Sequence, residues 1–177
     1  MAEPSPGDGR ALPRELLLLR HGKAVPHGSV VPDFARPLDE RGRVDTAWMA
    51  RWAVDAGVVP DLVVSSPAAR ARETAEGFCR EAGLSVAAIR WREIIYDAHV
   101  SGLLEVLAEC PAEFRRVLLV GHNPGFELLA GLLGHGDPHQ VRLATAAAAR
   151  IRMPEDWSGL APGDGEMIEV VRPPKRR

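Results

Sequence analysis

Short runs of continuously apolar residues alternate along the chain with longer stretches of helical spacing. The apolar runs cover residues 16–19 and 117–120 and, after Asp61, residues 62–64, and the helical stretches cover residues 42–55, 101–110 and 124–133. Apolar runs of this length are typical of strands buried on both faces of a parallel sheet. Strands that alternate with helices in this way predict an α/β fold.

Local signals fill in the remaining elements. Ser66 followed by Pro67 predicts a capped helix that runs to Gly83, and residues 86–89 are apolar enough for a third strand. Residues 144–149 are rich in alanine, which favours a helix by propensity. However, the alternation over residues 150–153 and the apolar run over 167–171 favour a closing pair of strands. We therefore expect a three-layer α/β/α fold with a mostly parallel central sheet.

The size and charge of the chain limit the domain organisation and the partners that it can have. We expect a disordered leader over residues 1–14, a single domain over 15–172 and a frayed tail over 173–177. A formal net charge of −2 argues against binding to nucleic acid, and no apolar run is long enough to cross a bilayer. Cys79 and Cys110 form no disulfide or metal pattern, which favours a cytoplasmic protein. No exposed apolar stripe is evident, so we expect a monomer.

Basic and imidazole side chains follow three of the predicted strands. Arg20 and His21 end the first, Arg70 lies in the first turn of the helix after the second, and His122 ends the strand over residues 117–120. Ligands of open α/β sheets bind at the carboxyl ends of the strands. A lone histidine after a strand is usually structural. Guanidinium groups, imidazoles and helix N-termini that converge at one edge instead predict a pocket for a phosphoryl group.

These residues also carry a resemblance to a known family, the histidine phosphatase superfamily, which includes the cofactor-dependent phosphoglycerate mutases. Four segments in order match its motifs: Leu-Arg-His-Gly at 19–22, Arg-Pro-Leu with a following Gly at 36–42, Ser-Pro-x-x-Arg-x-x-x-Thr-Ala at 66–75, and Gly-His-Asn at 121–123. The resemblance implies a phosphoglycerate mutase-like fold. The chain is most similar to the short SixA-like branch of phosphohistidine phosphatases, and it lacks the Asn that mutases carry shortly after Arg-His-Gly.

The resemblance implies a role for each matching residue. His21 is the nucleophile and forms a phosphohistidine intermediate, and Arg20, Arg70 and His122 bind the phosphoryl oxygens. The second ring nitrogen of His21 should donate to a backbone carbonyl. Glu93 lies where mutase-like members carry their acid, although a solvated carboxylate is an equally good interpretation. Asp33 and His99 are secondary candidates for the rim of the pocket.

The sequence thus predicts a phosphatase that needs no metal or other cofactor. Its substrate would be a phosphohistidine protein, for example a histidine phosphotransfer domain, or a small phosphate ester. The alternatives are a non-catalytic phosphate-binding scaffold and a sugar-phosphate phosphatase or mutase. A cysteine phosphatase is disfavoured, although Cys110 and Arg116 have Cys-x5-Arg spacing, because Pro111 and Glu113 spoil the anion cradle.

Overall fold

The structure is a computed structural model that describes residues 13–28 and 31–175. Its six strands form one sheet in the order β3-β2-β4-β1-β5-β6. β3, β2, β4 and β1 are parallel, and β5 and β6 run antiparallel to their neighbours. The strands are β1 (Arg14–Arg20), β2 (Leu62–Ser65), β3 (Arg90–Trp91), β4 (Arg116–Gly121), β5 (Ala148–Met153) and β6 (Glu166–Val171). The centre of the sheet is therefore parallel, as the sequence predicts.

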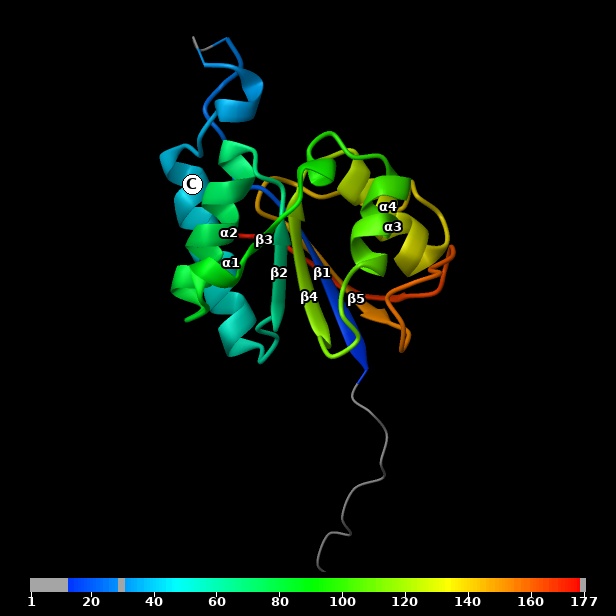
Figure 1. The fold of residues 1–177 in the computed structure, drawn as a ribbon. Helices are drawn as coiled ribbons and strands as arrows, with labels where there is room; N and C mark the ends of the chain where they lie inside the picture. Colours follow the sequence, from blue (N-terminus) through cyan, green and yellow to red (C-terminus); the bar gives the residue numbers. More distant parts are fainter. Residues whose placement is uncertain (1–12, 29–30, 176–177) are drawn as a thin grey trace, which may run out of the picture.

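Helices cover both faces of this sheet (Figure 1). α1 and α2 lie on one face and α3 and α4 on the other, which gives the three layers that the sequence predicts. The helices are α1 (Glu40–Asp55), α2 (Ala69–Glu81), α3 (Val100–Ala108) and α4 (Gly125–His135), and the short 3-10 turns are η1 (Asp33–Ala35), η2 (Val86–Ala88) and η3 (Glu93–Ile95).

The leucines of β1 pack against the helices on both faces of the sheet. Leu16 and Leu18 belong to the apolar cluster under α3 and α4, while Leu17 and Leu19 belong to the cluster under α1 and α2. Alternate side chains of a strand point to opposite faces, so a continuous leucine run fits only a strand that is covered on both sides. All four leucines are at most 1% exposed. The pattern that predicts the strand thus also fixes its place in the middle of the fold.

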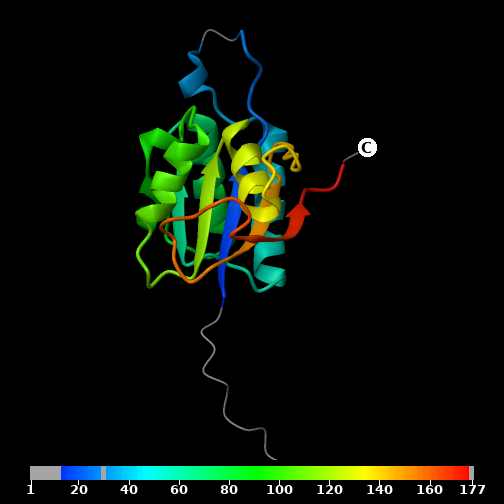
Figure 2. The ribbon, with the colours of Figure 1, turned by 90° about the vertical axis from the view of Figure 1, so that its right-hand side faces the viewer.

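The alanine-rich segment is not helical, and its last two residues, Ala148 and Ala149, begin β5. β5 pairs antiparallel with β1 and with β6, which lies at the outer edge of the sheet (Figure 2). The side chains of Ala147, Ala148 and Ala149 are at most 2% exposed. Pairing with β1 therefore overrides the helix propensity of alanine, as the alternation after Arg150 predicts.

Two local predictions are wrong. Residues 86–88 form η2, in which the Ala88 N–H donates to the Ser85 carbonyl at 3.1 Å, and strand pairing begins only at Arg90, opposite Val64. α2 begins at Ala69 and has no side-chain cap. The predicted cap, Ser66, lies too early in the chain to cap α2. Its hydroxyl instead contacts the side chain of His122, which follows β4.

The sequence predicts that both ends of the chain are irregular. Most of the predicted leader, residues 1–12, lies outside the described residues, and Arg14 already belongs to β1. Residues 173–175 follow β6 without regular structure, and 176 and 177 lie outside the described residues. Among the helices of residues 13–28 and 31–175, none is long and apolar enough to span a bilayer.

The loop after β1 packs directly on the start of α1. Asp39 caps this helix by accepting a hydrogen bond from the Gly42 N–H at 2.7 Å. A Cβ added to Gly42 would lie 2.2 Å from the Lys23 carbonyl oxygen, and one added to Gly22 would lie 2.7 Å from the Gly42 carbonyl oxygen. Both neighbours are backbone atoms, which cannot rotate away. The two glycines therefore allow α1 to hold the loop that follows β1.

We expect Gly42→Ala to lower the free energy of unfolding by about 2 kcal/mol or more, because the added methyl group collides with the backbone of Lys23. Urea unfolding measures this loss. Gly77→Ala is the matched control, since its Cβ would meet only a Thr46 methyl group at 3.4 Å in the interior of α2. That substitution should be neutral or stabilising by up to about 1 kcal/mol. Equal effects of the two substitutions would contradict the close approach at Gly42.

Candidate active site

The carboxyl ends of β1, β2 and β4 bring three predicted site residues together. β1 and β4 are parallel neighbours with Arg20 opposite Gly121, so His21 and His122 follow in adjacent positions. Their ring centroids are 5.1 Å apart. Arg70, in the first turn of α2, places its Nε 3.2 Å from Nε2 of His21. The three side chains are each at most 9% exposed and form one buried cluster.

The His21 ring is held in one tautomer. Its Nδ1 lies 2.7 Å from the Gly22 carbonyl oxygen. A carbonyl can only accept, so Nδ1 carries the hydrogen and Nε2 carries the lone pair. Burial lowers the pKa of His21 to about 4. The Gly22 hydrogen bond opposes this shift, and the charges of Arg70 and Arg20 add to it. At neutral pH the ring is therefore uncharged and its Nε2 is nucleophilic.

Two of the sequence motifs are joined through Thr74. The Gly22 N–H donates to the Thr74 hydroxyl at 3.0 Å, and that hydroxyl donates to the Arg70 carbonyl at 2.7 Å. The His21 N–H also donates to the Gly121 carbonyl at 2.9 Å. The turn after β1 is thus tied to both α2 and β4. This explains why a threonine four residues after Arg70 belongs to the pattern.

The His122 ring is also uncharged in this structure. Its Nε2 lies 2.8 Å from the Ser66 hydroxyl. Burial lowers the pKa of His122 to about 3, and the neighbouring His21 and Arg70 lower it further, while Asp33 opposes them. A bound anion would supply the missing negative charge and favour protonation of His122.

Buried polar atoms without a partner gather at this site. Within the described residues, the buried side-chain atoms that lack a hydrogen bond are Arg20 Nε, His122 Nδ1 and Asn123 Oδ1. The other end of the Arg20 guanidinium donates to the Leu143 carbonyl at 2.9 Å, and the Asn123 amide donates to the same oxygen at 2.9 Å. Arg20 Nε is a donor, whereas Asn123 Oδ1 can only accept. A buried unpaired donor is costly, so Arg20 Nε marks a place where a ligand can supply an acceptor.

Asp33 lies at this site, where the sequence placed it as a rim candidate. Arg70 donates to its backbone oxygen at 2.8 Å and to its carboxylate at 3.2 Å, and the Tyr96 hydroxyl donates to the same carboxylate oxygen at 2.9 Å. Arg36 donates to the second oxygen at 2.9 Å. Burial raises the pKa of Asp33, but the bonds from Tyr96 and Arg36 and the charge of Arg70 outweigh it and lower the pKa to about 2. The carboxylate is therefore ionised.

The other two predicted residues lie outside this network. Glu93 begins η3 with an exposed side chain, and among the described residues no hydrogen bond or ion pair joins its carboxylate to the site. His99 precedes α3, is exposed, and makes no side-chain cap. In contrast, Tyr96 at the end of η3 contacts the site, with its ring 5.5 Å from that of His122. No local pattern marks Tyr96. Ser66 belongs to the Ser-Pro motif, but nothing in the sequence indicates its contact with His122, because only the folded chain brings the ends of β2 and β4 together.

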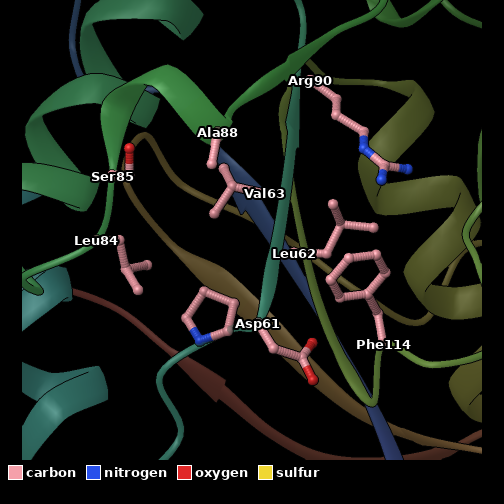
Figure 3. Close-up of a pocket in the computed structure, with 9 residues that line it drawn as sticks. Asp61, Leu62, Val63, Leu84, Ser85, Ala88, Arg90 and Phe114 are labelled. Atoms are coloured by element: carbon pink, nitrogen blue, oxygen red, sulfur yellow. The ribbon is translucent and has the colours of Figure 1, made fainter.

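Two other features are separate from the site. Cys110 is buried, its thiol donates to the Val106 carbonyl at 3.4 Å, and burial raises its pKa to about 11. It is therefore a poor nucleophile, as expected. A hollow of about 220 Å³ beside β2 and β3 is lined by none of the site residues (Figure 3). It is lined by Pro60, Asp61, Leu62, Val63, Leu84, Ser85, Ala88, Arg90 and Phe114.

Comparison with known proteins points to one family. The model of the histidine phosphatase superfamily (branch 1) matches residues 16–127, a stretch that contains His21, Arg70 and His122. An uncharacterised chloroplastic protein of Arabidopsis thaliana is 27% identical over 176 residues, which are 92% of this chain and 79% of the relative. An uncharacterised protein of Mycobacterium tuberculosis is 27% identical over 159 residues, which are 85% of this chain and 96% of the relative.

Solved structures agree with this match. A protein of Nakamurella multipartitia, provisionally described as the phosphohistidine phosphatase SixA, is 30% identical with a TM-score of 0.79 and covers 92% of this chain and 98% of its own. A similarly described protein of Agrobacterium tumefaciens is 29% identical, with a TM-score of 0.74 and coverages of 92% and 100%. The protein histidine phosphatase SixA complexed with tungstate, 22% identical with a TM-score of 0.76 over 89% and 96%, shares the fold. The chain therefore belongs to the histidine phosphatase superfamily, and within it to the SixA-like branch.

Proposed function

We propose that this member of a phosphatase superfamily hydrolyses its substrate in two steps, through a phosphohistidine on Nε2 of His21 and without a metal ion. The observation that carries the proposal is the orientation of the His21 ring. Nδ1 donates to the Gly22 carbonyl at 2.7 Å, which leaves the Nε2 lone pair facing Arg70. A buried, neutral imidazole with a fixed tautomer is what an in-line attack on phosphorus requires.

In the first step the Nε2 lone pair of His21 forms a bond to phosphorus, and the bond between phosphorus and the leaving group breaks. Arg20, Arg70 and His122 surround the position of the transferred group and bind its oxygens. The unpaired Arg20 Nε and His122 Nδ1, and the Arg70 Nε that lies 3.2 Å from Nε2 of His21, support this role. Charge spread over the phosphoryl oxygens is stabilised by guanidinium groups that are already in place, which is the usual source of rate in phosphoryl transfer.

In the second step water attacks the phosphorus of the intermediate, and the electron pair of the P–N bond returns to Nε2 of His21. The Gly22 carbonyl stabilises the ring while it carries the phosphoryl group, because Nδ1–H remains its donor throughout. Phosphate then leaves, and the neutral ring is restored. His21 thus needs no change of tautomer during the cycle.

Glu93 is the proposed acid for oxyester substrates, whose leaving alkoxide needs a proton. Its exposed carboxylate lies in η3, three residues before Tyr96, which contacts the site. A substrate that carries phosphorus on an imidazole nitrogen has less need of this acid, since its ring is protonated before it leaves.

Protein phosphohistidine is the proposed natural substrate, with a small phosphate ester as the second choice. Two SixA-type structures at 29% and 30% identity support this assignment. The partner would then be a protein that carries a phosphorylated histidine, such as a histidine phosphotransfer domain.

We expect His21→Ala to reduce hydrolysis of para-nitrophenyl phosphate by roughly a thousandfold or more, because the nucleophile is removed. The assay is run in the presence of a metal chelator. Cys110→Ala is the matched control, since the thiol is buried away from the site, and it should keep the activity of the unaltered chain. Activity that survives in His21→Ala, or that depends on Cys110, would contradict the assignment of the nucleophile.

We also expect the free energy of unfolding to decrease at pH values below about 6.5, because His21 and His122 are buried in their neutral form. The folded pKa is about 4 for His21 and about 3 for His122, below the ordinary 6.5. Between these values the unfolded chain binds protons that the folded protein does not, so stability is complete above 6.5 and decreases as the pH falls. The slope approaches roughly 1.4 kcal/mol per pH unit for each ring.

Urea unfolding between about pH 7 and about pH 5 measures this slope. His122→Gln should remove about half of it, whereas His99→Gln should leave it unchanged because that ring is exposed to solvent. A slope that does not respond to His122→Gln would show that the buried rings are not the groups held neutral.

A further inference from the structure

The network around Arg70 contains one acidic side chain, and the two proposed steps give it no task. Within the described residues, Asp33 supplies the only carboxylate that is bonded to Arg70. Its side chain is 37% exposed, whereas that of Arg70 is 8% exposed. The carboxylate thus lies on the solvent side of the phosphate-binding arginine. A substrate's leaving group must occupy the same side, because His21 attacks phosphorus from the buried side.

The partners of Asp33 make it an acceptor and not a proton donor. One carboxylate oxygen accepts from the Tyr96 hydroxyl and from Arg70, and the other accepts from Arg36. His27 also faces the second oxygen, with Nε2 at 3.4 Å. A carboxylate held in this way stays ionised and has no proton to give to a leaving alkoxide. It does have a negative charge to offer to a leaving group that is positive.

A fixed negative charge at the mouth of a phosphate pocket discriminates between substrates. The dianionic phosphoryl group is repelled by it in every substrate alike. An alkoxide or phenoxide leaving group gains further negative charge as its bond breaks, which the carboxylate disfavours. An imidazole that leaves from phosphohistidine starts as a cation, with its second ring nitrogen protonated, which the carboxylate stabilises.

We infer that Asp33 is a specificity-determining residue, which favours substrates whose phosphoryl group is bonded to a protonated imidazole. The inference rests on the proposed function and assigns its leaving-group preference. In the step, Nε2 of His21 bonds to phosphorus and the P–N bond of the substrate breaks. Its electron pair returns to the substrate ring, which departs as neutral imidazole and keeps the proton on its other nitrogen. The Asp33 carboxylate accepts the hydrogen bond from that N–H, and no proton is transferred.

A simpler role for Asp33 is to position Arg70. Its backbone oxygen already accepts from Arg70 at 2.8 Å, and its carboxylate adds a second contact. Loss of positioning would slow every substrate by a similar factor, because all of them need Arg70. Loss of the charge would slow a P–N substrate more than a P–O substrate. The ratio of two kcat/KM values therefore separates the two roles.

The experiment compares a short peptide that carries phosphohistidine with para-nitrophenyl phosphate, whose leaving group needs no proton. Asp33→Asn keeps the size of the side chain and removes the charge. We expect it to lower kcat/KM for the phosphopeptide about tenfold more than for para-nitrophenyl phosphate. Asp33→Glu restores the charge and should recover part of the lost ratio. Tyr96→Phe removes one bond to the same carboxylate but keeps its charge, so the ratio should stay near that of the unaltered chain.

Equal losses for both substrates in Asp33→Asn would overturn the inference and leave Asp33 as a positioning residue for Arg70. A change of ratio in Tyr96→Phe as large as that in Asp33→Asn would also overturn it, since the charge is present there. If the unaltered protein hydrolyses para-nitrophenyl phosphate but not the phosphopeptide, the proposed substrate itself is wrong. That result differs from the first two, in which the unaltered protein cleaves both substrates.

Discussion

The hydrogen bond from Nδ1 of His21 to the Gly22 carbonyl is the interaction on which the rest of the site depends. It lies within the turn that ends β1, and its length is 2.7 Å. Because the acceptor belongs to the next residue, the backbone that places the histidine also fixes its tautomer. The close approach of Gly22 and Gly42 and the bond from Gly22 to Thr74 hold that backbone in place. The fold therefore determines which nitrogen carries the lone pair.

The surroundings of His21 are arranged for a negative charge that a substrate brings. Arg20 donates to the carbonyl group of Leu143, which satisfies a donor without neutralising the charge, whereas Arg70 also pairs with the Asp33 carboxylate. The neutral state of both histidines limits the repulsion among these groups in the unliganded protein. A phosphoryl group would reverse the balance, because its oxygens pair with the guanidiniums and favour a protonated His122. Asp33, on the solvent side, leaves one negative charge at the mouth.

Much of this arrangement can be predicted from the sequence, because burial and strand direction constrain it. A leucine run that must be buried on both faces predicts β1 and the layers around it, and parallel strands bring Arg20, His21 and His122 to the same edge. The contact between Asp33 and Tyr96 cannot be predicted from the sequence. It joins η1 and η3, which are about 60 residues apart and have no hydrophobic periodicity. Ser66 shows the same limit. Its place before a proline favours a helix cap, and only the tertiary structure turns its hydroxyl toward His122.

The position of the phosphoryl group on the protein distinguishes a His21 nucleophile from every other one. The protein is mixed with para-nitrophenyl phosphate and denatured in alkali within the first turnover, which preserves phosphohistidine. NMR of the labelled imidazole then identifies the residue and the ring nitrogen that carry phosphorus. We expect phosphorus on Nε2 of His21, since Nδ1 donates to the Gly22 carbonyl. Phosphorus on Nδ1 of His21, or on any other residue, would contradict it.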